Sequence, residues 1–464
     1  MADTLRIVSP VDGSIYAQRP FVPREAALAA VDRASSAQAA WRHVPLLQRL
    51  RILSDAVDRF VTERDAVAEE LAWQMGRPVC QGGGEVAGFA DRARYMLEIA
   101  PTALAPLDPG EKPGFRRYIR REPVGVVFTV APWNFPYMTA VNSIWPALAA
   151  GNAVMLKHAR QTALCGERLA RVLAEAGLPD GLFQAVHMDH DSAAAVMRHE
   201  AVRLVCFTGS VAGGRAVQRA IAEGPGFPGT GLELGGKDPA YVRSDADVAQ
   251  AAAGIADGAL FNAGQSCCSV ERVYVHASIH DVFVEALVAE ARMLRLGHPL
   301  DPNTTLGPMV KTGAAAFVRG QIDEAVAAGA QALIDPATFP GNTPDGPYMA
   351  PQVLVNVDHR MRVMREESFG PVVGVMRVSS DEEAIALMND SEFGLTASIW
   401  TRDVAAAERI GDQVDTGTVF MNRCDYLDPA LAWAGVKHTG RGCTLSPMGY
   451  EYLTRPKSFH LRLE

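Results

Sequence analysis

Hydrophobic positions in the first part of the chain recur every three or four residues, which is the spacing of one face of an α-helix. The pattern runs from Arg24 to about Arg77 and includes Leu28, Val31, Leu46, Leu50, Leu53 and Val57. It predicts amphipathic helices at the start of the chain. The run Gly82 to Gly84 follows this region. Because no strand precedes it and Ala87 stands where a dinucleotide-binding loop needs its third glycine, we expect a loop or a helix boundary.

From Val124 onward, short apolar runs alternate with helical spacing. Strands are expected at 124–130, 153–157, 183–186 and 204–208, and helices at 138–150, 162–176 and after Ser210. A second alternating region begins after Gly236, with helices at 248–261 and 280–294 and strands at 272–276, 353–357, 372–376 and 397–401. Segments 297–309 and 339–351, rich in Pro and Gly, are expected loops. Such alternation predicts an α/β protein with parallel sheets covered on both faces.

Length and charge narrow the class of protein. A chain of 464 residues is too long for one core, so two or three domains are expected. The net charge of -9 and the pI near 5.7 argue against a nucleic-acid surface. The basic run Arg116 to Arg121 could bind phosphate, but we favour a solvated strand or hairpin edge.

The N-terminus and the cysteines indicate a compartment. Residues Met1 to Arg6 hold no apolar signal segment, and no apolar run approaches the roughly 20 residues that span a bilayer. We therefore expect a cytoplasmic protein without a membrane partner. The 7 cysteines show neither a disulfide framework nor metal-ligand spacing. We expect reduced thiols and no metal.

Three separate motifs carry groups that suit one reaction. Gly264-Gln265-Ser266-Cys267-Cys268 offers a thiol, Leu232-Glu233-Leu234-Gly235-Gly236-Lys237 a carboxylate, and Pro132-Trp133-Asn134-Phe135-Pro136 an amide. A thiol can form a thioester, a carboxylate with a raised pKa can activate water, and an amide can stabilise an oxyanion. Aldehyde oxidation through a thioester needs this set.

Each group also has a simpler interpretation. A single cysteine is usually a buried core thiol, Glu233 could pair with Lys237, and Asn134 could only shape a turn. Asn134, however, follows an expected strand at the edge where parallel sheets place ligand sites. Cys268 points away from Cys267 if the segment is extended, and we interpret it as a pocket-lining or redox-sensitive neighbour.

In this order and spacing, the motifs resemble those of the aldehyde dehydrogenase superfamily over nearly the whole chain. The resemblance implies an aldehyde dehydrogenase-like α/β fold with two Rossmann-like parallel-sheet domains. These are an NAD(P)-binding domain, 1–106 and 124–232, and a catalytic domain, 233–455. It also implies a non-acylating reaction in which Cys267 attacks an aldehyde, Asn134 holds the oxyanion and Glu233 activates the water that hydrolyses the thioester.

Two other classes resemble this chain less well. Acylating relatives, which use coenzyme A, usually lack the glutamate that stands here as Glu233. Non-catalytic binding or structural proteins on the same fold tend to lose the nucleophile that stands here as Cys267. Fold alone does not decide between these classes.

The resemblance also implies an oligomerisation element at 107–123 and 456–464. In the family, a hairpin at this place pairs with the C-terminal strand, here about 457–463, across subunits. A homodimer or homotetramer is therefore expected. The alternative is an ordinary surface hairpin.

The cofactor site is identified by resemblance because no G-x-G-x-x-G loop is present. The strand, turn and helix around Gly209 can direct amide groups at a pyrophosphate. The implied NAD or NADP contacts are Trp133, Lys157, Arg160, Gly209, Ser210, Gly214, Leu234, Glu367 and Phe369. NAD-dependent relatives often carry Glu where Arg160 stands. An arginine could pair with a 2'-phosphate or point into solvent, so either dinucleotide is possible.

The substrate pocket resembles that of the family more loosely. Its candidates are Phe135, Met138, Thr139, Asn142, Phe261, Ser266, Cys268, Arg423, Tyr426 and Leu427, a mostly apolar set that suits a neutral aliphatic or aromatic aldehyde. Lys157-His158-Ala159 resembles bacterial succinate-semialdehyde dehydrogenases, which would imply an anionic substrate. Asn142 and Phe261, however, stand where those enzymes place carboxylate-binding arginines. Arg423 is the only nearby substitute apparent in the sequence.

Overall fold

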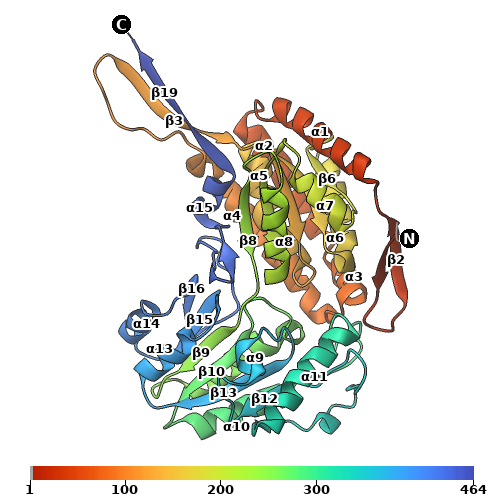
Figure 1. The fold of residues 1–464 in the computed structure, drawn as a ribbon, viewed down its shortest axis with the longest axis vertical. Coiled ribbons are helices and arrows are strands. Elements are labelled where there is room, and N and C mark those ends of the chain that lie inside the picture. The colour runs from red at the N-terminus through yellow and green to blue at the C-terminus, as the bar shows by residue number, and fades with distance from the viewer. Residues whose placement is uncertain (1–3, 464) are drawn as a thin grey trace.

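The computed structural model describes residues 4–463 and is built around two parallel sheets (Figure 1). The six-stranded sheet has the order β18-β8-β7-β4-β5-β6. Its strands are β4 (Val126–Ala131), β5 (Ala153–His158), β6 (Phe183–Ala185), β7 (Val202–Thr208), β8 (Gly229–Glu233) and β18 (Gly440–Arg441). Only β18 pairs antiparallel, with β8. Strand β4 is apolar along nearly its whole length because both faces of the sheet are covered.

The seven-stranded sheet has the order β11-β12-β13-β10-β9-β15-β16. Its strands are β9 (Asp238–Val242), β10 (Val270–His276), β11 (Gln331–Ala332), β12 (Gln352–Val355), β13 (Val372–Val378), β15 (Thr396–Trp400) and β16 (Thr418–Met421). Every pair except β11 with β12 is parallel. The expected α/β fold is confirmed, as are the predicted strands.

Helices cover both sheets. Those of the first part are α1 (Arg24–Trp41), α2 (Leu46–Val61), α3 (Arg64–Met75), α4 (Val79–Ala103), α5 (Pro136–Ala150), α6 (Ala163–Glu175), α7 (His190–Met197) and α8 (Val211–Ala222). The second part contains α9 (Val248–Leu260), α10 (His280–Arg292), α11 (Thr312–Ala327), α12 (Arg362–Arg365), α13 (Asp381–Asn389), α14 (Val404–Gly411) and α15 (Ser446–Tyr452). The helical start predicted from the periodicity is confirmed.

The glycine run departs from its prediction. Gly82 to Gly84 lie inside α4, not in a loop or at a helix boundary. The reason is packing, since a Cβ added to Gly82 would overlap Ala68 of α3. The glycine allows the two helices to approach closely.

An arm of two strands projects from the body (Figure 1). Strand β3 (Phe115–Pro123) pairs antiparallel with β19 (Thr454–Arg462). The basic run therefore lies in a strand, as favoured above. The prediction that these two strands pair across subunits is wrong, because both belong to one chain. Helix α15 packs against α4 and delivers the C-terminal strand beside β3; the Tyr450 hydroxyl donates to the Met96 carbonyl at 2.6 Å.

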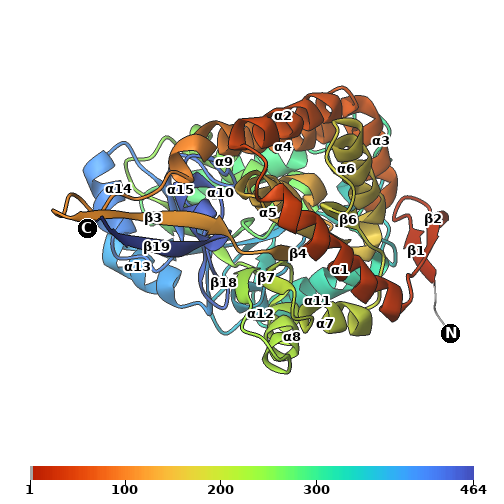
Figure 2. The same cartoon turned by 90° about the horizontal axis from the view of Figure 1, so that it is seen from above.

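Short strands complete the structure. Hairpin β1 (Thr4–Val8) and β2 (Ile15–Pro20) lies on the opposite side of the body from the arm (Figure 2). Strand β14 (Phe393–Gly394) pairs with β17 (Val436–Lys437). No helix within residues 4–463 has the length and apolarity needed to cross a membrane.

Candidate active site

Two cavities meet between the sheets. The first has a volume of about 480 Å³ and the second about 570 Å³. Thr208, Glu233 and Cys267 line both cavities. The thiol and the carboxylate predicted to react therefore lie at the junction of the two spaces.

The loop that carries Cys267 is held in an unusual backbone conformation. Asn262, Ala263 and Gly264 all have positive φ, with values of 53°, 56° and 68°. The Asn262 amide donates to the carbonyls of Asn134 at 3.3 Å and Gln265 at 3.2 Å. Gln265 in turn accepts from the Val310 N–H at 2.8 Å and donates to the Asn262 carbonyl at 3.0 Å. These bonds offset the cost of left-handed backbone and tie the thiol loop to Asn134.

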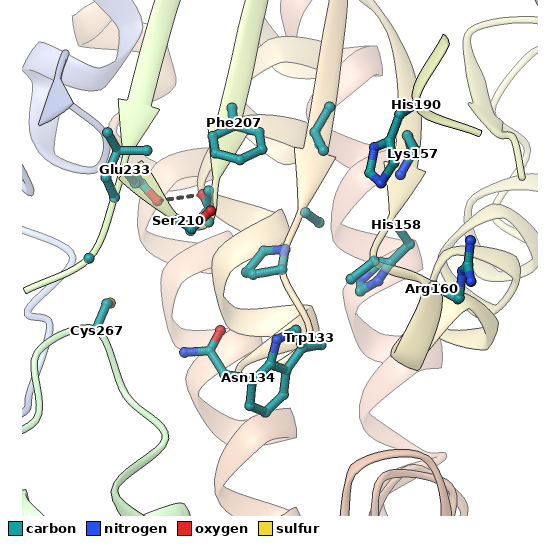
Figure 3. Close-up of a pocket in the computed structure, with 18 of the residues that line it drawn as sticks. Trp133, Asn134, Lys157, His158, Arg160, His190, Phe207, Ser210, Glu233 and Cys267 are labelled. Atoms are coloured by element: carbon teal, nitrogen blue, oxygen red, sulfur yellow. Dashed lines mark hydrogen bonds between the residues drawn. The ribbon is translucent and has the colours of Figure 1, made fainter. Parts of the chain in front are cut away.

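Asn134 lies between the end of β4 and the start of α5. Its carbonyl also accepts a hydrogen bond from Arg77, which forms a buried ion pair with Glu85. Glu85 accepts from the N–H groups of Tyr137 and Met138 at 2.8 and 2.9 Å, so it satisfies the first turn of α5. Figure 3 shows the Asn134 amide directed toward the side of the cavity that holds Cys267. The buried Arg77–Glu85 pair therefore holds both the Asn134 carbonyl and the start of α5 in place.

Glu233 ends β8 and is held by two hydroxyls. Thr208 donates to one carboxylate oxygen at 2.9 Å and Thr444 to the other at 2.7 Å; the dashed line beside Glu233 in Figure 3 marks the first of these bonds. Burial raises the pKa of Glu233, against the opposing effect of these hydrogen bonds. Lys237 does not pair with Glu233, because it forms an ion pair with Glu271. Among residues 4–463, the Glu233 carboxylate therefore forms no ion pair.

The first cavity gathers most of the predicted cofactor contacts. Its wall includes Trp133, Lys157, Arg160, Gly209, Ser210, Leu234, Glu367 and Phe369, while Gly214 lies behind it against Leu234. Among residues 4–463, Lys157 and Arg160 form no ion pair, and Figure 3 shows them at the far end from Cys267. Burial lowers the pKa of Lys157, as does the Arg160 charge. Two unpaired cations fit an anionic ligand.

Helix α8 contributes its N-terminus to the same cavity. Ser210 caps the helix, accepting from the Gly213 N–H at 3.1 Å. A Cβ on Gly214 would come within 2.8 Å of the Leu234 side chain, so only glycine lets α8 approach here. The geometry fits a dinucleotide phosphate at the helix terminus.

The other end of the first cavity holds an aromatic pair and a carboxyl. The Trp133 and Phe369 rings meet edge to face, with centroids 5.5 Å apart. Glu367 accepts from the Gly236 N–H at 3.0 Å, and burial raises the pKa of Glu367 to about 7. The Leu234 N–H is occupied by the Thr439 carbonyl at 2.8 Å, so only the Leu234 carbonyl is left to meet a ligand.

The second cavity collects nearly all predicted pocket residues. Phe135, Met138, Thr139, Asn142, Phe261, Ser266, Cys268, Tyr426 and Leu427 line it. Arg423 does not; its guanidinium stacks on the Tyr426 ring at 3.4 Å from the ring centroid. The proposal of Arg423 as a pocket cation is therefore wrong, because the aromatic neighbour holds the charge at the surface.

Cys268 lines the second cavity together with Cys267, which agrees with its interpretation as a pocket-lining neighbour. Residues 267 and 268 form a turn, so the segment is not extended and Cys268 does not point elsewhere. A hydrogen bond with Cys267 and burial both raise the pKa of the Cys268 thiol. Cys268 therefore stays protonated at neutral pH and is a poor nucleophile.

Six charged residues of the second cavity were not predicted. They are Arg77, Glu85, Asp91, Arg92, Asp257 and Asp425. Arg92 comes from α4 and donates to the Met138 carbonyl at 2.6 Å and to the Asn142 side-chain oxygen at 3.5 Å. Asn142 stands where succinate-semialdehyde dehydrogenases place an arginine, and Arg92 supplies a positive charge there from another helix. No local sequence pattern reveals this contact.

Comparison with known proteins agrees with this geometry. Residues 1–459 match the Aldehyde dehydrogenase family. The chain is 34% identical to 3,6-anhydro-alpha-L-galactose dehydrogenase of Streptomyces coelicolor, over 99% of this chain and 93% of that protein. It is 36% identical to succinate-semialdehyde dehydrogenase [NADP(+)] 1 of Mycobacterium bovis, over 91% and 92% respectively. NADP-dependent glyceraldehyde-3-phosphate dehydrogenase of Bacillus halodurans, solved with NADP, superposes with a TM-score of 0.93 at 31% identity, covering 100% of this chain and 96% of that one.

Proposed function

The chain belongs to the aldehyde dehydrogenase family as an NAD(P)-dependent enzyme, and we propose that it oxidises a neutral aldehyde through a thioester on Cys267. One observation carries the proposal: Cys267 and Glu233 line both cavities, so one thiol can meet a substrate on one side and a dinucleotide on the other. The reaction converts aldehyde, NAD(P)+ and water into carboxylic acid and NAD(P)H.

Each proposed step uses a group already in place. The Cys267 thiolate attacks the aldehyde carbon, and the Asn134 amide donates to the oxyanion. NAD(P)+, when bound, accepts the hydride that leaves this carbon. Glu233 then takes a proton from water, which attacks the thioester and releases the acid and the Cys267 thiolate. The raised pKa of Glu233 suits this role, since it makes the carboxylate a stronger base.

The cofactor would be held by the first cavity. We propose that Lys157 contacts the adenosine ribose, that α8 and Ser210 face the pyrophosphate, and that Glu367 and Phe369 hold the nicotinamide end. Arg160 is exposed, and its guanidinium lies 5.9 Å from the centroid of the Phe21 ring. Because it lines the cavity with no acidic partner among the described residues, it is available for a 2'-phosphate.

Replacing Arg160 with glutamate should therefore change cofactor preference. We expect the NADP/NAD ratio of kcat/KM to fall about 30- to 1000-fold in Arg160→Glu, from a lost charge-assisted contact plus repulsion. Initial rates with each dinucleotide measure the ratio. Arg219→Glu, a charge reversal on the exposed side of α8, is the control and should leave the ratio within about twofold. A change below about threefold in Arg160→Glu would mean that Arg160 faces solvent.

The substrate proposal is an uncharged aliphatic or aromatic aldehyde. Phe135, Phe261 and Leu427 give the second cavity an apolar wall, and Asp257 and Asp425 would repel a substrate carboxylate. A succinate-semialdehyde-type reaction is the second candidate. Arg92 in the cavity wall and the 36% identity to an enzyme named for that substrate favour it.

An initial-rate screen distinguishes these candidates. Propanal, benzaldehyde and succinate semialdehyde are each offered with NAD and with NADP, and the acid product is identified. We expect kcat/KM for a neutral aldehyde to exceed that for succinate semialdehyde by about tenfold, because like charges cost more than 1 kcal/mol at short range. The reverse order would establish the second candidate, and no oxidation of any aldehyde would contradict both.

The assembly is also a proposal. We propose that residues 1–106 and 124–232 bind the cofactor, that 233–455 carry catalysis and that 107–123 with 456–464 mediate a homodimer or homotetramer. The β3–β19 arm supports this, since it projects from the body and has unpaired strand edges (Figure 1).

A further inference from the structure

The second cavity contains an unpaired cation and an unpaired anion that do not contact each other. Arg92 is only 8% exposed, yet it forms no ion pair with any residue in the described range 4–463. Only its Nη1 group finds protein acceptors, the Met138 carbonyl and the Asn142 side chain. Nε and Nη2 are left to the cavity that Arg92 lines. A buried guanidinium with free donors points to an acceptor on a ligand.

Asp425 presents the complementary group. One of its carboxylate oxygens accepts from the Cys268 thiol at 2.8 Å and from the Ser266 hydroxyl at 3.2 Å. The other oxygen has no partner among residues 4–463 and belongs to a residue of the cavity wall. Burial raises the pKa of Asp425 to about 6, against hydrogen bonds and the Arg92 charge that lower it. The carboxylate is therefore mostly ionised at neutral pH, and its second oxygen lacks a donor.

The position of Asp425 locates the ligand group. Ser266 and Cys268, which hold the carboxylate, flank Cys267 on either side. Because Asp425 shares the cavity with Cys267 and bonds to both of its neighbours, a group on a substrate carbon close to the carbonyl is the one expected to reach Asp425. Asp91 on α4 and Asp257 on α9 add further carboxylates to the wall, and the charge of Asp257 raises the pKa of Asp425.

We infer that this enzyme selects aldehydes with hydroxyl groups on the second or third carbon, each hydroxyl donating to Asp425 and accepting from Arg92. The inference rests on the proposed function and names its substrate class. A hydroxyl fits because it donates and accepts without a charge. An ammonium group would be repelled by Arg92, and a carboxylate by Asp425 and Asp257. Alkyl aldehydes would leave both polar groups without partners.

The test compares three-carbon aldehydes in one protein preparation. For the parent enzyme, kcat/KM for glyceraldehyde should exceed that for propanal by about tenfold or more, since one hydrogen bond to a charged group is worth about that factor. In Asp425→Asn, the ratio should fall about 10- to 100-fold. Asparagine keeps the side-chain size and tolerates the φ of 48° at this position, so the fold is retained. Using a ratio cancels any general loss of activity.

Controls separate this inference from the proposed function. Asp428→Asn removes a carboxylate from the same loop outside the cavity, where it caps the Ala430 N–H, and should leave the ratio within about twofold. If the enzyme oxidises propanal and its kcat/KM for glyceraldehyde is no higher than that for propanal, the inference is overturned. The proposed function would still stand. A ratio that Asp425→Asn shifts by less than threefold would also overturn the inference, as would a preference for 3-aminopropanal, which indicates a cation subsite. Failure to oxidise any aldehyde would overturn both.

Discussion

Replacing Cys267 with alanine should lower aldehyde turnover by about 10³-fold or more, because no other group in the cavity can form the covalent intermediate. Cys267 lines both cavities, and the neighbouring Cys268 thiol has its pKa raised by a hydrogen bond and by burial. The neighbour therefore cannot replace the missing thiolate. Steady-state NAD(P)H formation with propanal or glyceraldehyde measures the loss.

Cys268→Ala provides the matched control for this prediction. It removes an adjacent thiol of the same wall and the donor to Asp425, but leaves the nucleophile in place. We expect it to keep about a tenth or more of the parent rate, since a lost hydrogen bond costs about 1 kcal/mol. Binding of NADPH, followed by its fluorescence, shows that both variants are folded. Equal activity in Cys267→Ala and the parent would refute the covalent mechanism.

The fold could be predicted because its signals are local. The buried strands β4 and β5 are short, mostly apolar runs, and the helices that follow them repeat at helical spacing. Strand β9 was not predicted, since Asp238 and Pro239 at its start obscure a five-residue strand that is buried throughout. The prediction for the glycine run failed because its role depends on Ala68 of the preceding helix α3, which packs against α4.

The residues of the candidate site also differ in whether the sequence could predict them. Cys267, Glu233 and Asn134 each lie in a motif that can be recognised in the sequence. The structure places Cys267 and Glu233 at the junction of the two cavities and Asn134 in the wall of the first. Arg92 and Asp425 have no such motif. Arg92 reaches the cavity because α4 packs against α5, and Asp425 is held there by hydrogen bonds from Ser266 and Cys268. The charges that we propose to select the substrate therefore come from tertiary packing, whereas the groups that we propose to react come from local sequence.

Replacing Glu233 with glutamine should separate hydride transfer from hydrolysis. Glutamine keeps the size of the side chain and can still bond to Thr208 and Thr444, but it cannot accept a proton from water. We expect steady-state turnover to fall about 10²- to 10⁴-fold. The first turnover should remain, giving a burst of one NAD(P)H per active site and an acyl adduct on Cys267. Stopped-flow absorbance and intact mass measure these two quantities.

The pH dependence of the parent enzyme tests the same assignment. Only the ionised carboxylate is a base, and burial raises the pKa of Glu233 above its usual value. The rate of deacylation should therefore decline on the acid side, starting at a higher pH than an exposed glutamate would allow. In Glu233→Gln, this acid limb should disappear from the slow steady rate. Glu367, whose pKa burial raises to about 7, titrates in a neighbouring range, so Glu367→Gln is the matched control and should keep the limb. The decline at low pH could instead survive in Glu233→Gln and disappear in Glu367→Gln. If Glu233→Gln also shows no burst, the base is Glu367.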